Sequence, residues 1–155
     1  MTAPEAGSAA PDFSLLGDTG PISLAAHRGH KLVLYFYPKD DTPGCTTEGK
    51  DFSSLRATFE AADTAIVGIS RDDIVAHAKF RAKHSLTVAL GADDLGAVTE
   101  AYGVWTAKSM YGKSYMGIER ATFLIDRDGC IARVWRKVKV PGHAAEVLAA
   151  AQVLG

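Results

Sequence analysis

Three short apolar runs along the chain have the length and composition of buried strands. Each is rich in aliphatic, β-branched or aromatic residues, and the first ends at Pro38. Runs of this kind are typical of strands buried on both faces of a sheet. The predicted strands span residues 31–37, 65–70 and 121–126. Residues 131–140 alternate enough to form the return arm of a hairpin, with Asp128 and Gly129 as its turn.

Helical periodicity separates these strands. Between the first two, Phe52, Leu55 and Phe59 recur at helical spacing, which predicts a helix over residues 46–62. Further helices are predicted over residues 72–84, 97–102 and 143–154. Strands that alternate with helices and end in a hairpin indicate an α/β layer with a mixed central sheet flanked by helices. This order fits a thioredoxin-like sandwich, and periodicity alone also permits other small doubly wound folds.

Composition narrows the classes of function. The 155 residues suit one domain over 1–155, with 47% hydrophobic and 23% charged residues, as in an average soluble protein. The net charge is −1 and the basic residues are scattered, so we expect no nucleic-acid or membrane partner. No apolar run approaches the roughly 18 residues of a membrane span, and the N-terminus lacks the pattern of a signal peptide. We therefore expect a cytoplasmic protein with a short, poorly ordered tail over residues 1–9.

One of only two cysteines, Cys45, follows Thr-Pro-Gly at the predicted strand-to-helix junction. Thr42 is a favoured N-cap and Pro43 is favoured at the first helical position, which places Cys45 at the third. Free N–H groups and the helix dipole stabilise an anion there, which lowers a thiol pKa and favours the reactive thiolate. Phe52 lies seven residues further on, so the sulfur is expected on the apolar side of the helix. The alternative is a cysteine that only fills space in the core.

Other cysteine chemistries lack their partner residues. A C-x5-R phosphate loop would need arginine where Asp51 stands, and a C-x-x-C motif would need cysteine in place of Glu48. Asp40 and Asp41 are interpreted as loop acids directed to solvent or to a cation, because carboxylates beside the sulfur would raise its pKa. We expect no metal, because no ligand spacing is recognisable. Local context marks none of the histidines as a catalytic base: His27, His30, His77, His84 and His143.

The segment around Cys45 resembles the peroxidatic motif of the peroxiredoxins. Residues 37–48 read Y-P-K-D-D-T-P-G-C-T-T-E, which matches P-x-x-x-T-x-x-C at Pro38, Thr42 and Cys45. The whole string is similar to the subfamily called bacterioferritin comigratory protein, or PrxQ. Residues 102–126 and 134–144 are similar to the second half of that subfamily. The resemblance therefore extends from about residue 10 to the C-terminus.

The resemblance implies a thiol peroxidase with a thioredoxin fold and no metal or organic cofactor. It implies that Cys45 attacks hydrogen peroxide or an organic hydroperoxide and becomes a sulfenic acid. Pro38 would shield the sulfur, and Thr42 would hydrogen-bond the thiolate and the peroxide. Arg120 would stabilise the thiolate and the transition state with fixed donors and a permanent charge, although spacing alone does not exclude a surface arginine at the edge of the hairpin. Glu48 would tether that arginine or support the helix start, unless it is an exposed acid.

A second catalytic cysteine is not evident. Many relatives carry a resolving cysteine five residues after the first, where this chain has Lys50, and residues 74–85, its place in other relatives, contain none. If Arg120 lies beside Cys45, the strand over 121–126 separates Cys130 from it by on the order of 20 Å, whereas a disulfide needs Cα atoms within about 7 Å. We therefore expect a one-cysteine mechanism with an external reductant, thioredoxin or glutaredoxin with glutathione, and an intermolecular bridge through Cys130 stays the alternative. The resemblance implies a monomer.

Two functions of other classes stay open. The chain could be a peroxide-sensing regulatory protein that signals through Cys45 without rapid turnover. It could also be a chaperone-like protein that works through oligomerisation and exposed apolar surface. Steady turnover with a cellular reductant separates the enzyme from the sensor, and holdase activity that survives Cys45→Ser would indicate the chaperone.

Overall fold

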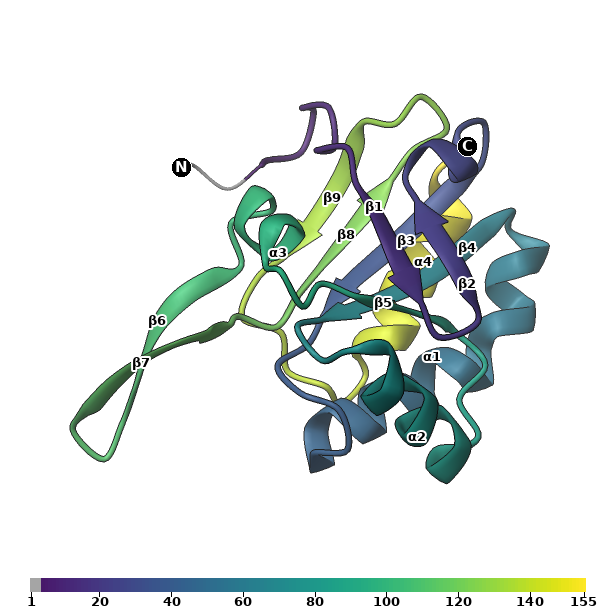
Figure 1. Cartoon of the computed structure of the whole chain (residues 1–155). Helices are drawn as coiled ribbons and strands as arrows, with labels where there is room; N and C mark the ends of the chain where they lie inside the picture. Colours follow the sequence, from purple (N-terminus) through teal and green to yellow (C-terminus); the bar gives the residue numbers. More distant parts are fainter. Residues whose placement is uncertain (1–3) are drawn as a thin grey trace.

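The computed structural model describes residues 4–155, which build a seven-stranded sheet at the centre of the molecule (Figure 1). In spatial order the strands are β2 (Gly20–Ser23), β1 (Ser14–Gly17), β5 (Ala89–Ala92), β4 (Thr64–Ser70), β3 (Lys31–Phe36), β8 (Ala121–Ile125) and β9 (Ile131–Trp135). β3, β4 and β5 run parallel, whereas β8 pairs with β3 in the antiparallel sense. The mixed central sheet predicted from the sequence is confirmed.

Side chains of the helices and of the N-terminal segment cover the two faces of this sheet. The helices are α1 (Pro43–Ala61), α2 (Ile74–His84), α3 (Ala97–Ala101), α4 (His143–Val153) and the short 3-10 helix η1 (Ala25–His27). All six residues of β3 are buried, as predicted. Val33 and Tyr35 face the core beneath α1, α2 and α4, whereas Leu32, Leu34 and Phe36 face the core on the other side. No helix within residues 4–155 is long and apolar enough to cross a membrane.

Four strands differ from the sequence prediction. The predicted hairpin arm over residues 131–140 is shorter, because β9 ends at Trp135. Beyond it the chain turns back, and the Val138 N–H donates to the Arg120 carbonyl at 3.0 Å. The strands β1, β2 and β5 were not predicted, since each has only four residues and contains a glycine.

A second hairpin was also missed by the apolar pattern. β6 (Trp105–Met110) and β7 (Lys113–Ile118) pair with each other and extend away from the central sheet (Figure 1). Tyr111 and Gly112 form the turn between them, with φ of 52° and 77°. Positive φ at both central residues is the requirement of a two-residue type I′ turn. Most of the side chains of β7 are exposed, so the hairpin has no apolar run that would reveal it.

The N-terminal segment pairs with the turn between β8 and β9. Gly7 N–H donates to the Ile131 carbonyl at 2.7 Å, and Ala10 N–H donates to the Gly129 carbonyl at 2.9 Å. Ala9 and Cys130 form an isolated antiparallel bridge. Of the expected tail, residues 1–3 lie outside the described residues, but residues 7–9 are not the free tail expected, because these backbone groups find partners on the turn.

Candidate active site

Two neighbouring strands bring Cys45 and Arg120 together. β3 leads through a short loop into α1, whose first turn carries Cys45, and Arg120 directly precedes β8. The two strands are antiparallel, and Phe36 at the end of β3 pairs with Ala121 at the start of β8. The end of one strand and the beginning of the other therefore lie at the same edge of the sheet. Residues 75 positions apart in the sequence meet there.

The start of α1 follows the sequence prediction in its backbone. Thr42 occupies the N-cap position with φ −95° and ψ 154°, Pro43 begins the helix, and Cys45 is the third helical residue. The first helical bond runs from Thr46 N–H to the Thr42 carbonyl at 2.9 Å, so the N–H of Cys45 precedes the helical ladder. The Thr42 side chain makes no capping bond. Its Oγ1 donates instead to the Lys39 carbonyl at 2.7 Å, which tightens the loop before the helix.

The Cys45 thiol is buried against a cation. Cys45 is only 2% exposed, and its Sγ accepts a hydrogen bond from Arg120 Nη2 at 3.3 Å. Arg120 thus presents a fixed positive charge and a hydrogen-bond donor directly to the sulfur. A Cβ atom at Gly44 would lie 3.2 Å from Arg120 Nη2. Glycine at this position therefore leaves the guanidinium room to lie over the first turn of α1.

Glu48 holds the other side of the same guanidinium. Its Oε1 accepts from Arg120 Nη1 at 2.5 Å, and the residue is 1% exposed, so the alternative of an exposed acid is wrong. Burial raises the pKa of Glu48 to about 7, although the nearby charge of Arg120 opposes the shift. Burial disfavours the charge of Arg120, but Glu48 and Cys45 together raise the pKa of that guanidinium above its usual value. Glu48 Oε2 has no hydrogen-bond partner among the described residues.

A neutral histidine packs beside this cluster. His143 is buried, and its Nε2 lies 2.8 Å from Thr122 Oγ1. Its ring meets Phe52 edge to face. Burial lowers the pKa of His143 to about 4, with Glu146 opposing and the charge of Arg120 adding to the effect. The imidazole of His143 is therefore uncharged at neutral pH and lies close to Arg120.

The β6–β7 hairpin supplies a second cation that sequence reasoning missed. Lys108 lies across Gly117, where a Cβ atom would come within 3.1 Å of the lysine Cδ. Burial lowers the pKa of Lys108, the positive charge of Arg120 lowers it further, and Cys45 opposes the shift. The exposed hairpin gave no apolar pattern by which this lysine could have been found. Pro38, the last of the site residues expected from the sequence, is half-buried just beyond β3.

The two aspartates before the helix have different environments. Asp41 is exposed and accepts hydrogen bonds from Lys83 and His84, as expected of an acid directed to a cation. Asp40 is not an ordinary loop acid, because it is 9% exposed. Its carboxylate accepts from the Tyr37 hydroxyl at 2.6 Å and contacts the His77 ring at 2.6 Å. This buried contact joins residues far apart in the sequence, so no local pattern marks it.

Cys130 lies at the opposite end of β8 from Arg120. It is half-buried, and its N–H donates to Asp126 Oδ1 at 2.9 Å. The five residues of β8 span about 16 Å. Both cysteines are free thiols. In the part of the chain that the structure describes, no group of three or more histidine, cysteine or acidic side chains is arranged to hold a metal ion.

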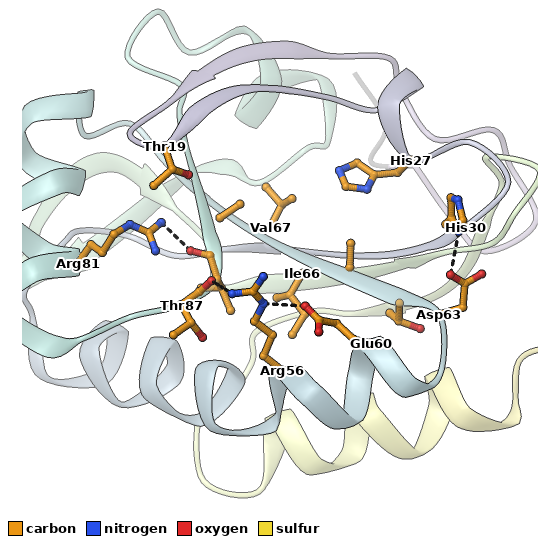
Figure 2. Close-up of a pocket in the computed structure, with 14 residues that line it drawn as sticks. Thr19, His27, His30, Arg56, Glu60, Asp63, Ile66, Val67, Arg81 and Thr87 are labelled. Atoms are coloured by element: carbon orange, nitrogen blue, oxygen red, sulfur yellow. Dashed lines mark hydrogen bonds and ion pairs between the residues drawn. The ribbon is translucent and has the colours of Figure 1, made fainter.

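The pocket drawn in Figure 2 lies apart from the Cys45 cluster. It has a volume of about 690 Å³ and is lined by α1, the first half of β4, the segment before β3 and residues 87–89 at the start of β5, together with Thr19 and Arg81. Its charged groups have partners: Arg56 Nε donates to Glu60 at 2.9 Å, and His30 contacts Asp63 at 2.7 Å. None of the residues of the Cys45 cluster lines it. The chemistry therefore has to be sought at Cys45 rather than in this pocket.

Comparison with known proteins finds the same fold and a well-defined family. A model of the AhpC/TSA family matches residues 6–134. Peroxiredoxin Bcp of Bacillus subtilis (strain 168) is 50% identical over 145 residues, which cover 93% of this chain and 92% of the relative. Peroxiredoxin Bcp of Xanthomonas campestris pv. campestris is 51% identical over 138 residues, which cover 89% of this chain and 86% of the relative.

Solved structures agree with the sequence comparison. Peroxiredoxin Q of Xanthomonas campestris superposes with a TM-score of 0.89 at 47% identity, covering 95% of this chain and 96% of that one. The bacterioferritin comigratory protein of the same organism, whose trapped intermediate and ligand complexes concern its alkyl peroxide reduction activity, gives a TM-score of 0.89 at 46% identity. This second match covers 96% of this chain and 98% of that chain. The predicted thioredoxin-like sandwich is confirmed by this likeness.

Proposed function

Because the chain belongs to the AhpC/TSA family and, within it, to the Bcp or PrxQ peroxiredoxins, we propose that it reduces hydrogen peroxide and organic hydroperoxides through Cys45. The observation that carries the proposal is the 3.3 Å contact between Arg120 Nη2 and Cys45 Sγ at the start of α1. It supplies what a peroxidatic thiol needs, a stabilised anion and a fixed donor beside it. The alkyl peroxide reduction activity of the Xanthomonas campestris relative supports the substrate class.

The first step is a two-electron oxidation of the sulfur. The Cys45 thiolate donates an electron pair to the nearer peroxide oxygen, the S–O bond forms, and the O–O bond breaks. The departing oxygen takes a proton and leaves as water or as an alcohol. The sulfur becomes a sulfenic acid, and the overall change is Cys–SH plus ROOH to Cys–SOH plus ROH.

The surrounding side chains have separate tasks in this step. Arg120 stabilises the thiolate and the negative charge that moves along the S–O–O line, because its donors are fixed before the reaction. Glu48 orients that guanidinium through the 2.5 Å contact to Nη1. Thr42 Oγ1 donates its proton to the Lys39 carbonyl, so in this proposal its lone pairs accept a hydrogen bond from the peroxide, and Pro38 shields the sulfur from water.

An external thiol completes the cycle in this proposal. A thiol attacks the sulfenic sulfur and releases water, and a second thiol then frees Cys45 and leaves as a disulfide. Lys50 is exposed on α1, and Cys130 lies beyond the far end of β8; both positions support a one-cysteine mechanism. We propose thioredoxin, or glutaredoxin with glutathione, as the reductant of a cytoplasmic monomer.

Intact mass spectrometry tests the proposal directly. The full chain is treated with one equivalent of hydrogen peroxide, with and without dimedone as a sulfenic-acid trap and without reductant. We expect one dimedone adduct on Cys45 of a monomeric chain, none in Cys45→Ser, and an unchanged adduct in Cys130→Ser. A disulfide that joins Cys45 to Cys130 would refute the one-cysteine mechanism.

Steady-state turnover tests the reductant and separates the enzyme from a sensor. We expect sustained peroxide consumption with thioredoxin and its reductase, or with glutaredoxin, glutathione and glutathione reductase. Full activity in Cys45→Ser would refute the assignment of the nucleophile. Oxidation of Cys45 that is followed by no turnover with either system would favour the peroxide-sensing function.

A further inference from the structure

Helix α2 contacts the loop before the Cys45 helix at two consecutive aspartates. His77, near the start of α2, reaches Asp40 at 2.6 Å. Lys83 and His84, in the last turn, each reach Asp41 at 2.7 Å. His77 and His84 are seven residues apart, close to two full turns, so they lie on the same side of the helix. α2 therefore holds this loop from one face, with a buried contact and an exposed one.

The buried contact has hydrogen-bond acceptors on both sides of the imidazole. The His77 side chain is 0% exposed. Its Nδ1 lies 2.6 Å from Asp40 Oδ2, and its Nε2 lies 2.9 Å from the Gly91 carbonyl oxygen. A carbonyl oxygen only accepts, so Nε2 must carry a proton. Asp40 Oδ1 meanwhile accepts from the Tyr37 hydroxyl at 2.6 Å. With a carboxylate oxygen at Nδ1 and a carbonyl oxygen at Nε2, the imidazolium form of His77 donates to both partners.

The charged groups around His77 agree with this geometry. Asp40 faces it from the loop, Asp72 from the connection between β4 and α2, the Tyr37 hydroxyl from the end of β3, and the Gly91 carbonyl from β5. Burial lowers the pKa of His77, but the bond to Asp40, its charge, the carbonyl and Asp72 together raise the pKa above its usual value. The cations at the other end of α2 are engaged with the neighbouring aspartate.

The loop is fixed through the backbone of Asp40 as well. Its N–H donates to Asp72 Oδ2 at 2.9 Å, and the same oxygen accepts from the Ser70 hydroxyl at 2.6 Å. Asp40 lies midway between Pro38 and Thr42, the two loop residues of the peroxidatic motif. A shift of Asp40 would therefore displace both of them relative to the sulfur.

We propose that His77 is a positioning residue for peroxide reduction, which as a buried imidazolium fixes Asp40 and, through it, the loop that leads into the Cys45 helix. The inference rests on the proposed peroxidase function and adds a pH-dependent control to the same site. Loss of one proton would leave a nitrogen lone pair facing an acceptor, which breaks one of the two contacts. The loop that leads into α1 would then loosen.

The sign of the pH dependence follows from the direction of the shift. A histidine whose pKa is raised by folding stabilises the folded arrangement fully below its ordinary pKa of about 6.5, and this contribution is lost as the pH rises through the folded pKa. The rate of Cys45 oxidation is therefore expected to fall on an alkaline limb as the pH rises through the folded pKa of His77.

Nitrogen NMR of the wild-type chain tests the charge state without any activity measurement. With ¹⁵N-labelled histidine, His77 is expected to show a proton on both ring nitrogens at pH 6.5 and to lose one only at higher pH, with His30 as the reference signal of an exposed ring. His30 is an exposed histidine whose Nδ1 contacts Asp63, far from Cys45. A neutral His77 ring at pH 6.5 would overturn the proposal. This readout stands even if the chain had no peroxidase activity.

Stopped-flow rates of Cys45 oxidation between pH 5.5 and 9.5 test the positioning role. His77→Gln and Asp40→Asn are expected to lower the maximal rate at least tenfold and to remove the alkaline limb. The double variant is expected to be no slower than the slower single variant, because both changes break one contact. His30→Gln serves as the control and should keep the wild-type profile.

Two results would overturn this role. One is a folded His77→Gln or Asp40→Asn chain with the wild-type rate and an intact alkaline limb. The other is a wild-type profile without an alkaline limb. If His77→Gln does not fold, Asp40→Asn and the nitrogen NMR decide. A wild-type chain that does not react with peroxide would refute the proposed function, and the NMR would still decide the charge of His77.

Discussion

The cost of burying the Glu48 carboxylate gives the sharpest quantitative prediction. The perturbation is Glu48→Gln in a Cys45→Ser background, which removes the titration of the thiol. Glutamine keeps the shape of the side chain and an oxygen that accepts from Arg120, but it carries no charge. The comparison therefore isolates the effect of ionising a carboxyl group that is 1% exposed and has an unpartnered Oε2.

The magnitude follows from the raised pKa. Burial, opposed by Arg120, moves the pKa of Glu48 from 4.5 to about 7. At 1.36 kcal/mol for each unit, the ionised carboxylate costs about 3 kcal/mol of folding free energy. Since the folded pKa lies above the unfolded one, the stabilisation is complete below pH 4.5 and is lost as the pH rises through about 7. The chain with Glu48 should therefore lose about 3 kcal/mol relative to the glutamine variant between pH 4.5 and pH 8.5.

Urea denaturation at a series of pH values measures this difference. Other titrating groups, His77 included, are present in both chains and cancel in the comparison. Glu60→Gln, at an exposed glutamate of the same helix, is the control for removing a carboxylate of α1 that is not buried. If the gap between the chain with Glu48 and its glutamine variant stayed constant with pH, or if the glutamine variant lost more stability, the pairing with Arg120 rather than burial would dominate and the reasoning would be wrong.

Three further changes test the packing and charge of the site. Arg120→Lys should slow Cys45 oxidation about 10²-fold, because a hydrogen bond to a charged group contributes about 1.5–3 kcal/mol; stopped-flow rates equal to those of an Arg56→Lys control would contradict this. Gly44→Ala should slow alkylation of Cys45 by iodoacetamide at pH 7, because the added Cβ would lie 3.2 Å from Arg120 Nη2; an unchanged rate would mean that the guanidinium moves freely. Phe52→Ala, at a residue 0% exposed, should lower the free energy of unfolding by about 3–5 kcal/mol, and a loss below about 1 kcal/mol in urea would show that the core closes over the gap.

The parts of the fold that the sequence predicted are those with strong local signals. β3 is an uninterrupted apolar run, and α1 begins where Thr42 and Pro43 indicate that it should. The β6–β7 hairpin lacks an apolar face, and its one local signal is the Tyr111-Gly112 turn. Local patterns report burial and turns, so an exposed hairpin is visible only through its turn.

The site was predictable in the same uneven way. Cys45 is marked by its position at a helix start, whereas Arg120 was identified through the family resemblance. The register between β3 and β8 brings Arg120 to the sulfur, and the residues next to Arg120 in the sequence do not predict that register. The contact between Asp40 and His77 joins positions 37 residues apart. Interactions of this kind depend on how elements pack, so spacing along the chain does not reveal them.

The register between β3 and β8 also determines when reactivity arises during folding. Cys45 gains its cation only after Phe36 has paired with Ala121, a contact that closes a loop of more than 80 residues. Contacts so distant in sequence carry a large closure entropy and tend to form after local ones. A nascent or truncated chain that ends before β8 would therefore carry an ordinary thiol. Fast reaction of Cys45 with peroxide would mark the chains in which the central sheet has been completed.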